Sequence, residues 1–310
     1  MLILQVSDQL GNQMFAYAAV KSIALDLNYK FGLYHEKTNS NLCNDSDEIF
    51  GHFIDTIFES IRSEIVVEIP KKYHFYRENT TIHSHMAYKE EAYKVNENTV
   101  MAGHYICPRY FEHRIDEVRK WFSFPEEIEG YSKKLIDDVR AKYGDKKLKI
   151  ISVHFRNAED YRNGGFMIND GYWFKAAKAL KKKIGFIPVF VVFYDKKTKL
   201  VERFIKEFNA FDIHHSLVVD MCTISKCDAH IVCNSSFSIM SALLNKNNPL
   251  VFRPSKFYIP DGSMPDDVFP SSWNVVKVRR NEWLEYKRKL RLINSSIKRQ
   301  IKTLLNLNEK

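Results

Sequence analysis

The stretch KIISVHFRNAEDY, residues 149–161, joins a short apolar run to a dense group of charged and polar side chains. The run KIISVHF has the length and β-branched content of a buried strand. Strands that are apolar on both faces belong to parallel sheets covered by helices on both sides. Ligands of such sheets bind beyond the carboxyl ends of the strands, where HFRNAEDY lies. The stretch therefore predicts a parallel α/β sheet with a functional site at its carboxyl edge.

The rest of the chain alternates between strand-like and helix-like patterns. After residue 149, strands are expected at KIISVHF (149–155), PVFVVFYD (188–195), HSLVVD (215–220), AHIVCN (229–234) and PLVFRPS (249–255). Helices are expected to begin near Gly171, Lys196, Met221 and Ser235. Before residue 149, strands are expected at LILQVS (2–7), KFGLYHE (30–36) and MAGHYI (101–106), and helices at 12–27, 109–122 and 125–143. This alternation is typical of open parallel sheets.

The length of 310 residues favours two domains, because one hydrophobic core rarely holds so long a chain. The basic stretch 142–149 contains a glycine and separates the two patterns, so we place the boundary there. The prediction is a Rossmann-like domain at 1–145 and a second one at 146–280. A helix at 281–310 completes the chain.

The formal net charge of +9 is concentrated at the C-terminal end. Residues 277–310 contain eleven Lys/Arg and three Asp/Glu, whereas the other 276 residues contain 36 and 35 and are nearly neutral. A nucleic-acid-binding domain would carry its positive charge over a whole face, so nucleic acid is not expected as a partner.

The basic segment 281–310 has apolar residues at helical spacing: Trp283, Leu290, Ile293, Ile297, Ile301 and Leu304. Such a helix either packs back over the fold or lies on an anionic membrane face. Both alternatives are open at this stage.

The five cysteines form no CxxC pair, and they suit a reducing compartment such as the cytosol. No stretch approaches the roughly 20 apolar residues that cross a bilayer. The expected location is cytoplasmic, and peripheral contact at the inner face of the membrane is expected if 281–310 lies on the membrane.

The first candidate site is HFRNAEDY (154–161), whose first two residues end the strand predicted at 149–155. Arg156 can bind an anionic phosphate with its forked, permanently charged guanidinium. Asp160 can serve as a general base, and Glu159 and Asp8 are the further candidates for that role. The alternative is a surface loop in which the arginine and a carboxylate pair with each other.

Two further clusters follow strands of the second half. Ser235 and Ser236 precede a helix, whose N-terminal N–H groups can hold a phosphate or simply be capped. Asp195 and Asp220 end two strands, where a carboxylate can accept hydrogen bonds from the N1–H and N2–H₂ edge of guanine. Helix capping is the alternative for both aspartates.

The turn after the first strand is the fourth cluster. Gly11 permits a tight turn near a ligand, and Asn12 and Gln13 can hydrogen-bond sugar hydroxyls. Asp8 and Phe15 belong to the same candidate substrate-binding turn.

Several other sites are absent from the sequence. There is no GxGxxG and no GxxxxGK[ST], which excludes the dinucleotide fingerprint and the P-loop. Asp45-Ser46-Asp47 resembles a DxD metal motif but has no flanking strand, and His83 and His85 have no further ligands at metal spacing. No metal site is expected.

In this order, the motifs resemble those of the α-1,2-fucosyltransferase family. LQVSDQLGNQMFAYAAVKSIA (4–24) is similar to its N-terminal L-G-N-Q-x-F-x-Y-A signature, and GHYICPRYFEHRIDEVRKWFSF (103–124) to its G-Y-x-x-S-x-x-Y-F segment. HFRNAEDY is similar to H-x-R-R-x-D-Y, and VCNSSFSIMSALLN (232–245) to A-N-S-S-F-S-W-W-G-A-W-L. Asn157 replaces the second arginine, and the wider H-x-R-x-x-x-D spacing is closer to the protein O-fucosyltransferases. Asp8 and Gln9 stand where the family has paired glycines.

The resemblance implies a GT-B fold, in which two Rossmann-like domains face a cleft, and a GDP-fucose donor used without a metal or other cofactor. Arg156 would contact the donor phosphates, His154 and Asp220 the guanine, and the helix after Ser235 and Ser236 a phosphate. Asn234 and Phe237 of the serine motif and Asp195 are assigned to the same donor site.

The expected reaction is inverting transfer of L-fucose from GDP-β-L-fucose to the 2-hydroxyl of a terminal β-galactoside. A lipid-linked acceptor at the inner membrane, in bacterial O-antigen or other surface-polysaccharide assembly, fits the C-terminal helix. The alternatives are a different GDP-sugar or linkage, a carbohydrate-binding protein without catalysis, and RNA binding through the basic tail. The last is disfavoured by the few aromatic residues interleaved there.

Overall fold

The computed structural model describes residues 1–34, 54–78, 88–144, 146–260 and 262–307, with side chains described up to Lys302. The DxD-like segment Asp45-Ser46-Asp47, the pair His83 and His85, and Cys43 lie outside the described residues. The other four cysteines are free and buried, as expected of small core residues.

The N-terminal sheet is parallel throughout, in the order β2-β1-β4-β3. Its strands are β1 (Leu2–Gln5), β2 (Phe31–Tyr34), β3 (His74–Arg77) and β4 (Thr99–Ala102). The chain leaves β1 toward β2 on one side and returns to β4 on the other. Strand order therefore reverses between β1 and β4, which makes the carboxyl ends of these two strands a topological switch point.

The C-terminal sheet is also parallel, in the order β12-β9-β8-β5-β6-β7. Its strands are β5 (Leu148–Phe155), β6 (Ile187–Tyr194), β7 (Phe211–Asp212), β8 (Ala229–Ile231), β9 (Leu250–Pro254) and β12 (Asn274–Val276). A small hairpin, β10 (Tyr258–Ile259) and β11 (Gly262–Ser263), lies outside it. The strand order here reverses between β5 and β8, so this sheet has a switch point of its own.

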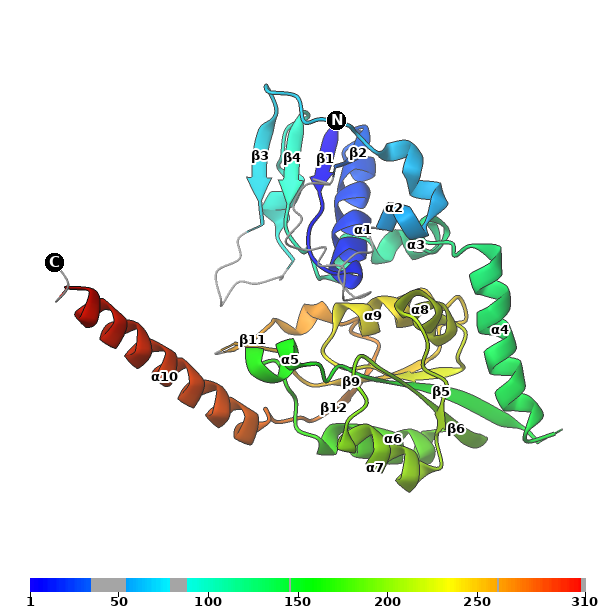
Figure 1. Cartoon of the computed structure of the whole chain (residues 1–310). Helices are drawn as coiled ribbons and strands as arrows, with labels where there is room; N and C mark the ends of the chain where they lie inside the picture. The colour runs from blue at the N-terminus through cyan, green and yellow to red at the C-terminus, as the bar shows by residue number, and fades with distance from the viewer. Residues whose placement is uncertain (35–53, 79–87, 145, 261, 308–310) are drawn as a thin grey trace.

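The helices connect and cover the strands (Figure 1). They are α1 (Leu10–Asp26), α2 (Ile54–Ile57), α3 (Ile115–Trp121), α4 (Glu126–Ala141), α5 (Glu159–Gly164), α6 (Gly171–Lys183), α7 (Lys199–Phe208), α8 (Leu217–Ser225), α9 (Ser236–Leu243) and α10 (Glu282–Leu307). Short 3₁₀ segments are η2 (Glu59–Glu64), η3 (Glu90–Tyr93), η4 (Pro108–Tyr110), η5 (Glu112–Arg114) and η6 (Asp266–Val268).

The prediction of a strand at HSLVVD (215–220) is wrong, because residues 217–225 form helix α8. Ser216 takes the extended N-cap conformation, and its carbonyl accepts the first helical hydrogen bond from the Asp220 N–H. A short apolar run does not distinguish a strand from a buried helix, which explains the error. Helices α6 and α9 begin within one residue of the expected positions, and α7 begins three residues later.

One hydrophobic cluster joins the two halves of the chain. Met14 and Phe15 of α1 belong to the same fully buried cluster as Ile239 and Met240 of α9. Helices α6 and α7 pack on the other side of the C-terminal sheet. Helix α4 also packs on this sheet, although it precedes residue 145. The division of the chain at 145 remains a proposal.

Helix α10 projects away from both sheets (Figure 1). Its first turns contact α5: Arg288 is 8% exposed, and Arg291 donates to Asn163 Oδ1 of α5. Residues 289–302 are all exposed, so this part of the helix does not pack back over the fold. Within the described residues, no helix is both long and apolar enough to cross a membrane.

Candidate functional site

A cavity of about 460 Å³ lies between the carboxyl edges of the two sheets. Its walls include residues that follow β1 and β4 in one half and β5, β6 and β8 in the other. Both topological switch points thus open into the same space, which is where open α/β sheets bind ligands. The volume is in the range of small-molecule sites.

Three helix N-termini face this cavity. The residues that line it include Leu10 at the start of α1, Ser216 and Leu217 at the start of α8, and Ser235 and Ser236 at the start of α9. Each helix N-terminus carries a partial positive charge and unpaired N–H groups. The combined field favours an anionic ligand.

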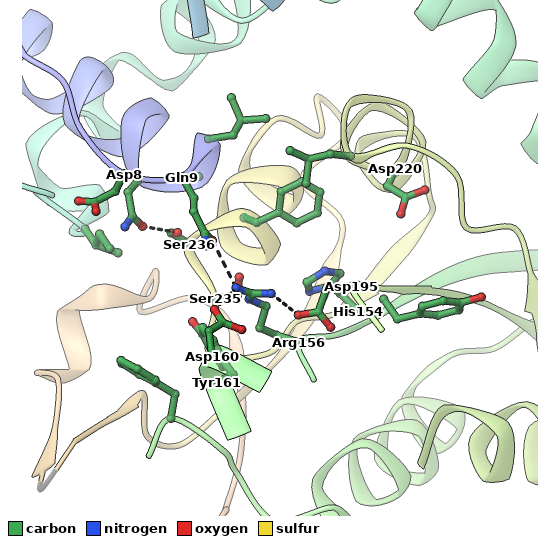
Figure 2. A pocket seen from close by; sticks show the side chains of 18 of the residues that line it. Asp8, Gln9, His154, Arg156, Asp160, Tyr161, Asp195, Asp220, Ser235 and Ser236 are labelled. Carbon is green, nitrogen blue, oxygen red and sulfur yellow. Dashed lines mark hydrogen bonds and ion pairs between the residues drawn. The ribbon is translucent and has the colours of Figure 1, made fainter. Parts of the chain in front are cut away.

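Arg156 supplies a full positive charge in the same cavity (Figure 2). Its guanidinium is 8% exposed, forms ion pairs with Asp195 and Asp160, and lies 4.6 Å from the centre of the Tyr161 ring. Its Nη2 also donates to the Gln9 Oε1 at 3.4 Å, across the two halves of the chain. The arginine is therefore rigidly oriented and central to the cavity.

The two carboxylates at Arg156 differ in how they are held. Asp195 also accepts hydrogen bonds from the N–H groups of Asn157 and Ala158, at 2.7 and 3.0 Å, so it fixes the loop that carries the arginine. The Asp160 side chain is 44% exposed and, within the described part of the chain, is held by Arg156 rather than by backbone N–H groups. Asp195 thus has a clear structural task, whereas Asp160 can be displaced by a competing anion.

His154 lies deeper, behind Arg156. Its ring packs against Phe237 with centroids 5.1 Å apart, and its Nδ1 lies 3.3 Å from the Cys233 sulfur. Burial lowers the pKa of His154 to about 4, so the imidazole is neutral near pH 7. A neutral imidazole offers one donor and one acceptor to a ligand.

Asp220 forms the far end of the cavity with His214 and Tyr194. Its carboxylate accepts from His214 Nδ1 at 2.6 Å and from the His215 N–H at 2.8 Å. Burial raises the pKa of Asp220, against the opposing effect of His214. The centres of the Tyr194 and His214 rings lie 4.3 Å apart and their planes are tilted by 38°, which gives this end an aromatic wall.

The turn after β1 contacts α9 directly. The Ser236 hydroxyl donates to Asn12 Oδ1 at 2.5 Å. A Cβ at Gly11 would lie 2.4 Å from the Phe237 backbone nitrogen, so α9 can approach this closely only because residue 11 is glycine. The glycine thus serves a helix–helix contact beside the cavity.

Beside that turn, Asp8 pairs with His104, and both residues line the cavity.

Four of the expected site residues do not line the cavity: Gln13, Phe15, Glu159 and Asn234. The Gln13 amide is buried and bonds the Asp8 carbonyl and the Ile54 N–H, which fixes the turn. Asn234 donates to the Phe166 carbonyl, and Phe15 packs on Phe111. Glu159 points to Lys196 on the surface. For these residues the helical or turn geometry directs the side chain away from the cavity.

Sequence reasoning missed several cavity residues, notably His104, Tyr194 and His214. Each lies within two residues of a strand end or next to an expected site residue, and that position was the available signal. As for metals, the described residues contain no group of three His, Cys, Asp or Glu side chains that could hold one.

No protein-family model and no curated protein sequence matches the chain. Solved structures do match it. NodZ α-1,6-fucosyltransferase co-crystallised with GDP superposes with a TM-score of 0.52 and 12% identity, over 78% of this chain and 92% of that one. Fucosyltransferase NodZ from Bradyrhizobium gives 0.52 and 13%, over 80% and 96%. POFUT1 in complex with GDP gives 0.50 and 11%, over 81% and 97%. The expected GT-B fold is thereby confirmed, and the expected C-terminal helix is present as α10.

Proposed function

We propose that the chain is an inverting glycosyltransferase that moves L-fucose from GDP-β-L-fucose to the 2-hydroxyl of a terminal β-galactoside. The observation that carries the proposal is the convergence of Arg156 and three helix N-termini on one cavity. A site of this kind suits a diphosphate leaving group, because it places positive charge where negative charge develops. The likeness to structures solved with GDP supports the choice of nucleotide.

In this proposal the diphosphate lies against Arg156 and the start of α9 at Ser235 and Ser236. These groups neutralise the leaving group in place of a metal ion. The guanidinium is already shared by Asp160 and Asp195. The incoming diphosphate therefore displaces the exposed Asp160, while Asp195 keeps the arginine in place.

The guanine lies toward His154 and Asp220. A carboxylate has about four lone-pair positions, and the two bonds to His214 and His215 leave room for the guanine N1–H and N2–H₂. Phe237 and the Tyr194–His214 wall supply apolar contact to the base. Residues 146–280 would then hold the donor, and residues 1–145 the acceptor.

The acceptor galactoside lies toward Asn12 and Asp8. Its hydroxyl attacks the anomeric carbon from the face opposite to GDP, with inversion through an oxocarbenium-like state. The α-1,2 linkage rests on the sequence motifs. Transfer of another GDP-sugar, formation of another linkage, or carbohydrate binding without catalysis are the alternatives.

The test is release of GDP from GDP-fucose with EDTA present, using lactose and N-acetyllactosamine as acceptors. Arg156→Ala is expected to lower kcat by about 10²- to 10³-fold. Arg62→Ala, which changes an exposed arginine of η2 outside the cavity lining, is the matched control and should behave as wild type.

A 2-deoxygalactoside acceptor decides the linkage, because it lacks the hydroxyl that should react. Equal release with this analogue would refute the 2-hydroxyl assignment. Loss of activity with EDTA would refute metal independence. Binding of GDP-fucose without release to any acceptor would favour the non-catalytic alternative, and failure to bind it would refute the donor.

We also propose that α10 lies on an anionic membrane face on the cytoplasmic side, where a lipid-linked oligosaccharide would be the acceptor in bacterial surface-polysaccharide assembly. Residues 282–307 contain seven Lys/Arg and two Glu. An exposed apolar stripe follows one side of the helix: Trp283, Tyr286, Leu290, Ile293, Ile297 and Ile301. Each basic residue near an anionic surface contributes roughly 1 kcal/mol.

A further inference from the structure

The cavity contains a carboxylate–imidazole pair on the side opposite the donor residues. Asp8 follows β1 and His104 follows β4, so the pair stands at the switch point of the N-terminal sheet. Asp8 Oδ2 is bonded to His104 Nε2, and the Ser7 hydroxyl donates to the same carboxylate oxygen at 3.2 Å. The Asp8 side chain is 43% exposed and the His104 side chain 24%, so the carboxylate faces the open cavity.

The backbone around this pair is held in uncommon conformations. Asp8 has φ +67°, Gly103 has φ +153° and Tyr105 has φ +48°. Positive φ is unusual for a bulky residue such as tyrosine, and such conformations concentrate at functional sites. Here three of them surround one side-chain pair.

A buried carboxylate, Glu78, holds the turn that presents His104. Its Oε2 accepts from the N–H groups of His104 and Tyr105 at 2.8 and 2.9 Å, and the residue is 1% exposed. A Cβ at Gly103 would lie 2.4 Å from the Glu78 Cβ, so the glycine allows this close approach. Glu78 therefore fixes the backbone that carries the His104 imidazole.

Among the described residues that line the cavity, the carboxylates are Asp8, Asp160, Asp195 and Asp220. The last three are engaged on the donor side, by Arg156 or by His214 and the His215 N–H. Asp8 lies instead beside Gln9, whose side chain touches Arg156. Asp8 thus lies on the N-terminal side of the cavity, where it pairs with His104 rather than with the leaving-group arginine (Figure 2).

We propose that Asp8 is the general base of the transfer and that His104 is its positioning residue. This rests on the proposed function and puts Asp8, a secondary candidate in the sequence, in the place of Asp160, the first candidate. The acceptor oxygen forms a bond to the anomeric carbon, and the bond from that carbon to the β-phosphate oxygen breaks. GDP leaves with the electron pair, and the acceptor proton passes to the Asp8 carboxylate.

The electrostatics of the pair agree with this role. The hydrogen bond from His104 lowers the pKa of Asp8, which keeps the carboxylate ionised near pH 7. For His104, burial lowers the pKa, but the hydrogen bond and charge of Asp8 and the charge of Glu78 together raise it. The acceptor hydroxyl becomes strongly acidic as it bonds to carbon, so a carboxylate of lowered pKa suffices to take its proton.

The test compares Asp8→Asn with wild type in GDP release from GDP-fucose. Asparagine adopts positive φ as readily as aspartate, so the turn is kept. We expect kcat to fall by about 10²- to 10⁴-fold, with the dissociation constant for GDP-fucose changed less than about threefold. Asp116→Asn, an exposed carboxylate of α3, is the matched control. Water can replace the acceptor, so slow donor hydrolysis gives a readout even where no acceptor reacts.

Two results would overturn the assignment. Near-normal turnover in Asp8→Asn would remove Asp8 from the chemistry. Loss of turnover with intact donor binding in Asp160→Asn alone would return the role to Asp160. In either case the wild-type protein still releases GDP, so the proposed function is kept. A wild-type protein that fails to bind GDP-fucose would instead refute the proposed function.

The role of His104 is tested by the pH dependence of kcat. Without its hydrogen bond the pKa of Asp8 rises, so the acidic limb of the profile should move to higher pH in His104→Ala. His104→Gln, which can still donate to Asp8, should restore part of both the rate and the profile. A rate loss with an unmoved acidic limb would mean that His104 serves only the fold.

Discussion

Replacing Gly11 by alanine should damage the site by forcing α1 and α9 apart, without removing any polar group that touches substrate. Gly11 lies in the first turn of α1, in an ordinary helical conformation that alanine adopts readily. The added methyl group would lie 2.4 Å from the Phe237 nitrogen and 2.8 Å from its Cα. Both are backbone atoms at the start of α9, so no rotamer change relieves the contact.

The size of the effect follows from these distances. Ordinary contact with a Cβ begins near 3.4 Å, so α1 and α9 must separate by about 1 Å. Overpacking costs about 1–3 kcal/mol, and the better helix propensity of alanine offsets about 1 kcal/mol of that. The net loss in the free energy of unfolding should be at most about 2 kcal/mol. A misplacement of about 1 Å at a binding group can cost about 100-fold in rate, so kcat/KM should fall much more than stability.

The assay measures kcat/KM for GDP-fucose together with the free energy of unfolding in urea. Gly130→Ala is the matched control, because Gly130 is also helical, in α4, and has no atom within 4 Å of an added Cβ. That variant should gain about 1 kcal/mol and keep full activity. A Gly11→Ala enzyme with wild-type kcat/KM would show that the contact between α1 and α9 does not position the donor site.

Two further predictions concern titration and the C-terminal helix. Burial lowers the pKa of His154 to about 4 and that of His230 to about 3, below the ordinary value of 6.5. Below pH 6.5 the unfolded chain therefore binds more protons than the folded chain, so the free energy of unfolding falls as the pH drops. Between pH 7.5 and 5, each histidine should lower the free energy of unfolding by about 2 kcal/mol. In urea unfolding, the free energy of unfolding of His230→Asn should therefore depend less steeply on pH than that of wild type. Equal slopes would contradict this. Replacing Leu290, Ile293 and Ile297 by serine should abolish sedimentation with phosphatidylglycerol–phosphatidylcholine vesicles and leave stability unchanged, because all three are exposed. Unchanged sedimentation, or a loss of self-association instead, would refute membrane contact.

The buried strands of the C-terminal sheet were predictable because they are continuous apolar runs, as in β5 and β6. Strand β3 was not, because its residues are mostly exposed at a sheet edge and carry no periodic signal. Helix α8 was mistaken for a strand because its apolar run is too short to show a period. Tertiary packing on α4 and α9, which the sequence does not display, decides its form.

The cavity residues were predictable where chemistry and strand ends coincide, as at Arg156, Ser235 and Asp8. Gln13 lies in the same motif as Asn12, but one helical step turns its amide into the core. The role of His104 was harder to predict, because its partner Asp8 lies far away along the chain and Glu78 fixes the shape of its turn.

The cluster that joins α1 to α9 also determines how the molecule unfolds. Met14 and Phe15 are covered by Ile239 and Met240, so neither sheet can melt without exposing apolar surface of the other. Melting should therefore be one cooperative event, with a calorimetric enthalpy equal to the van't Hoff value. Two parallel sheets that each resemble a complete domain then behave as a single thermodynamic unit.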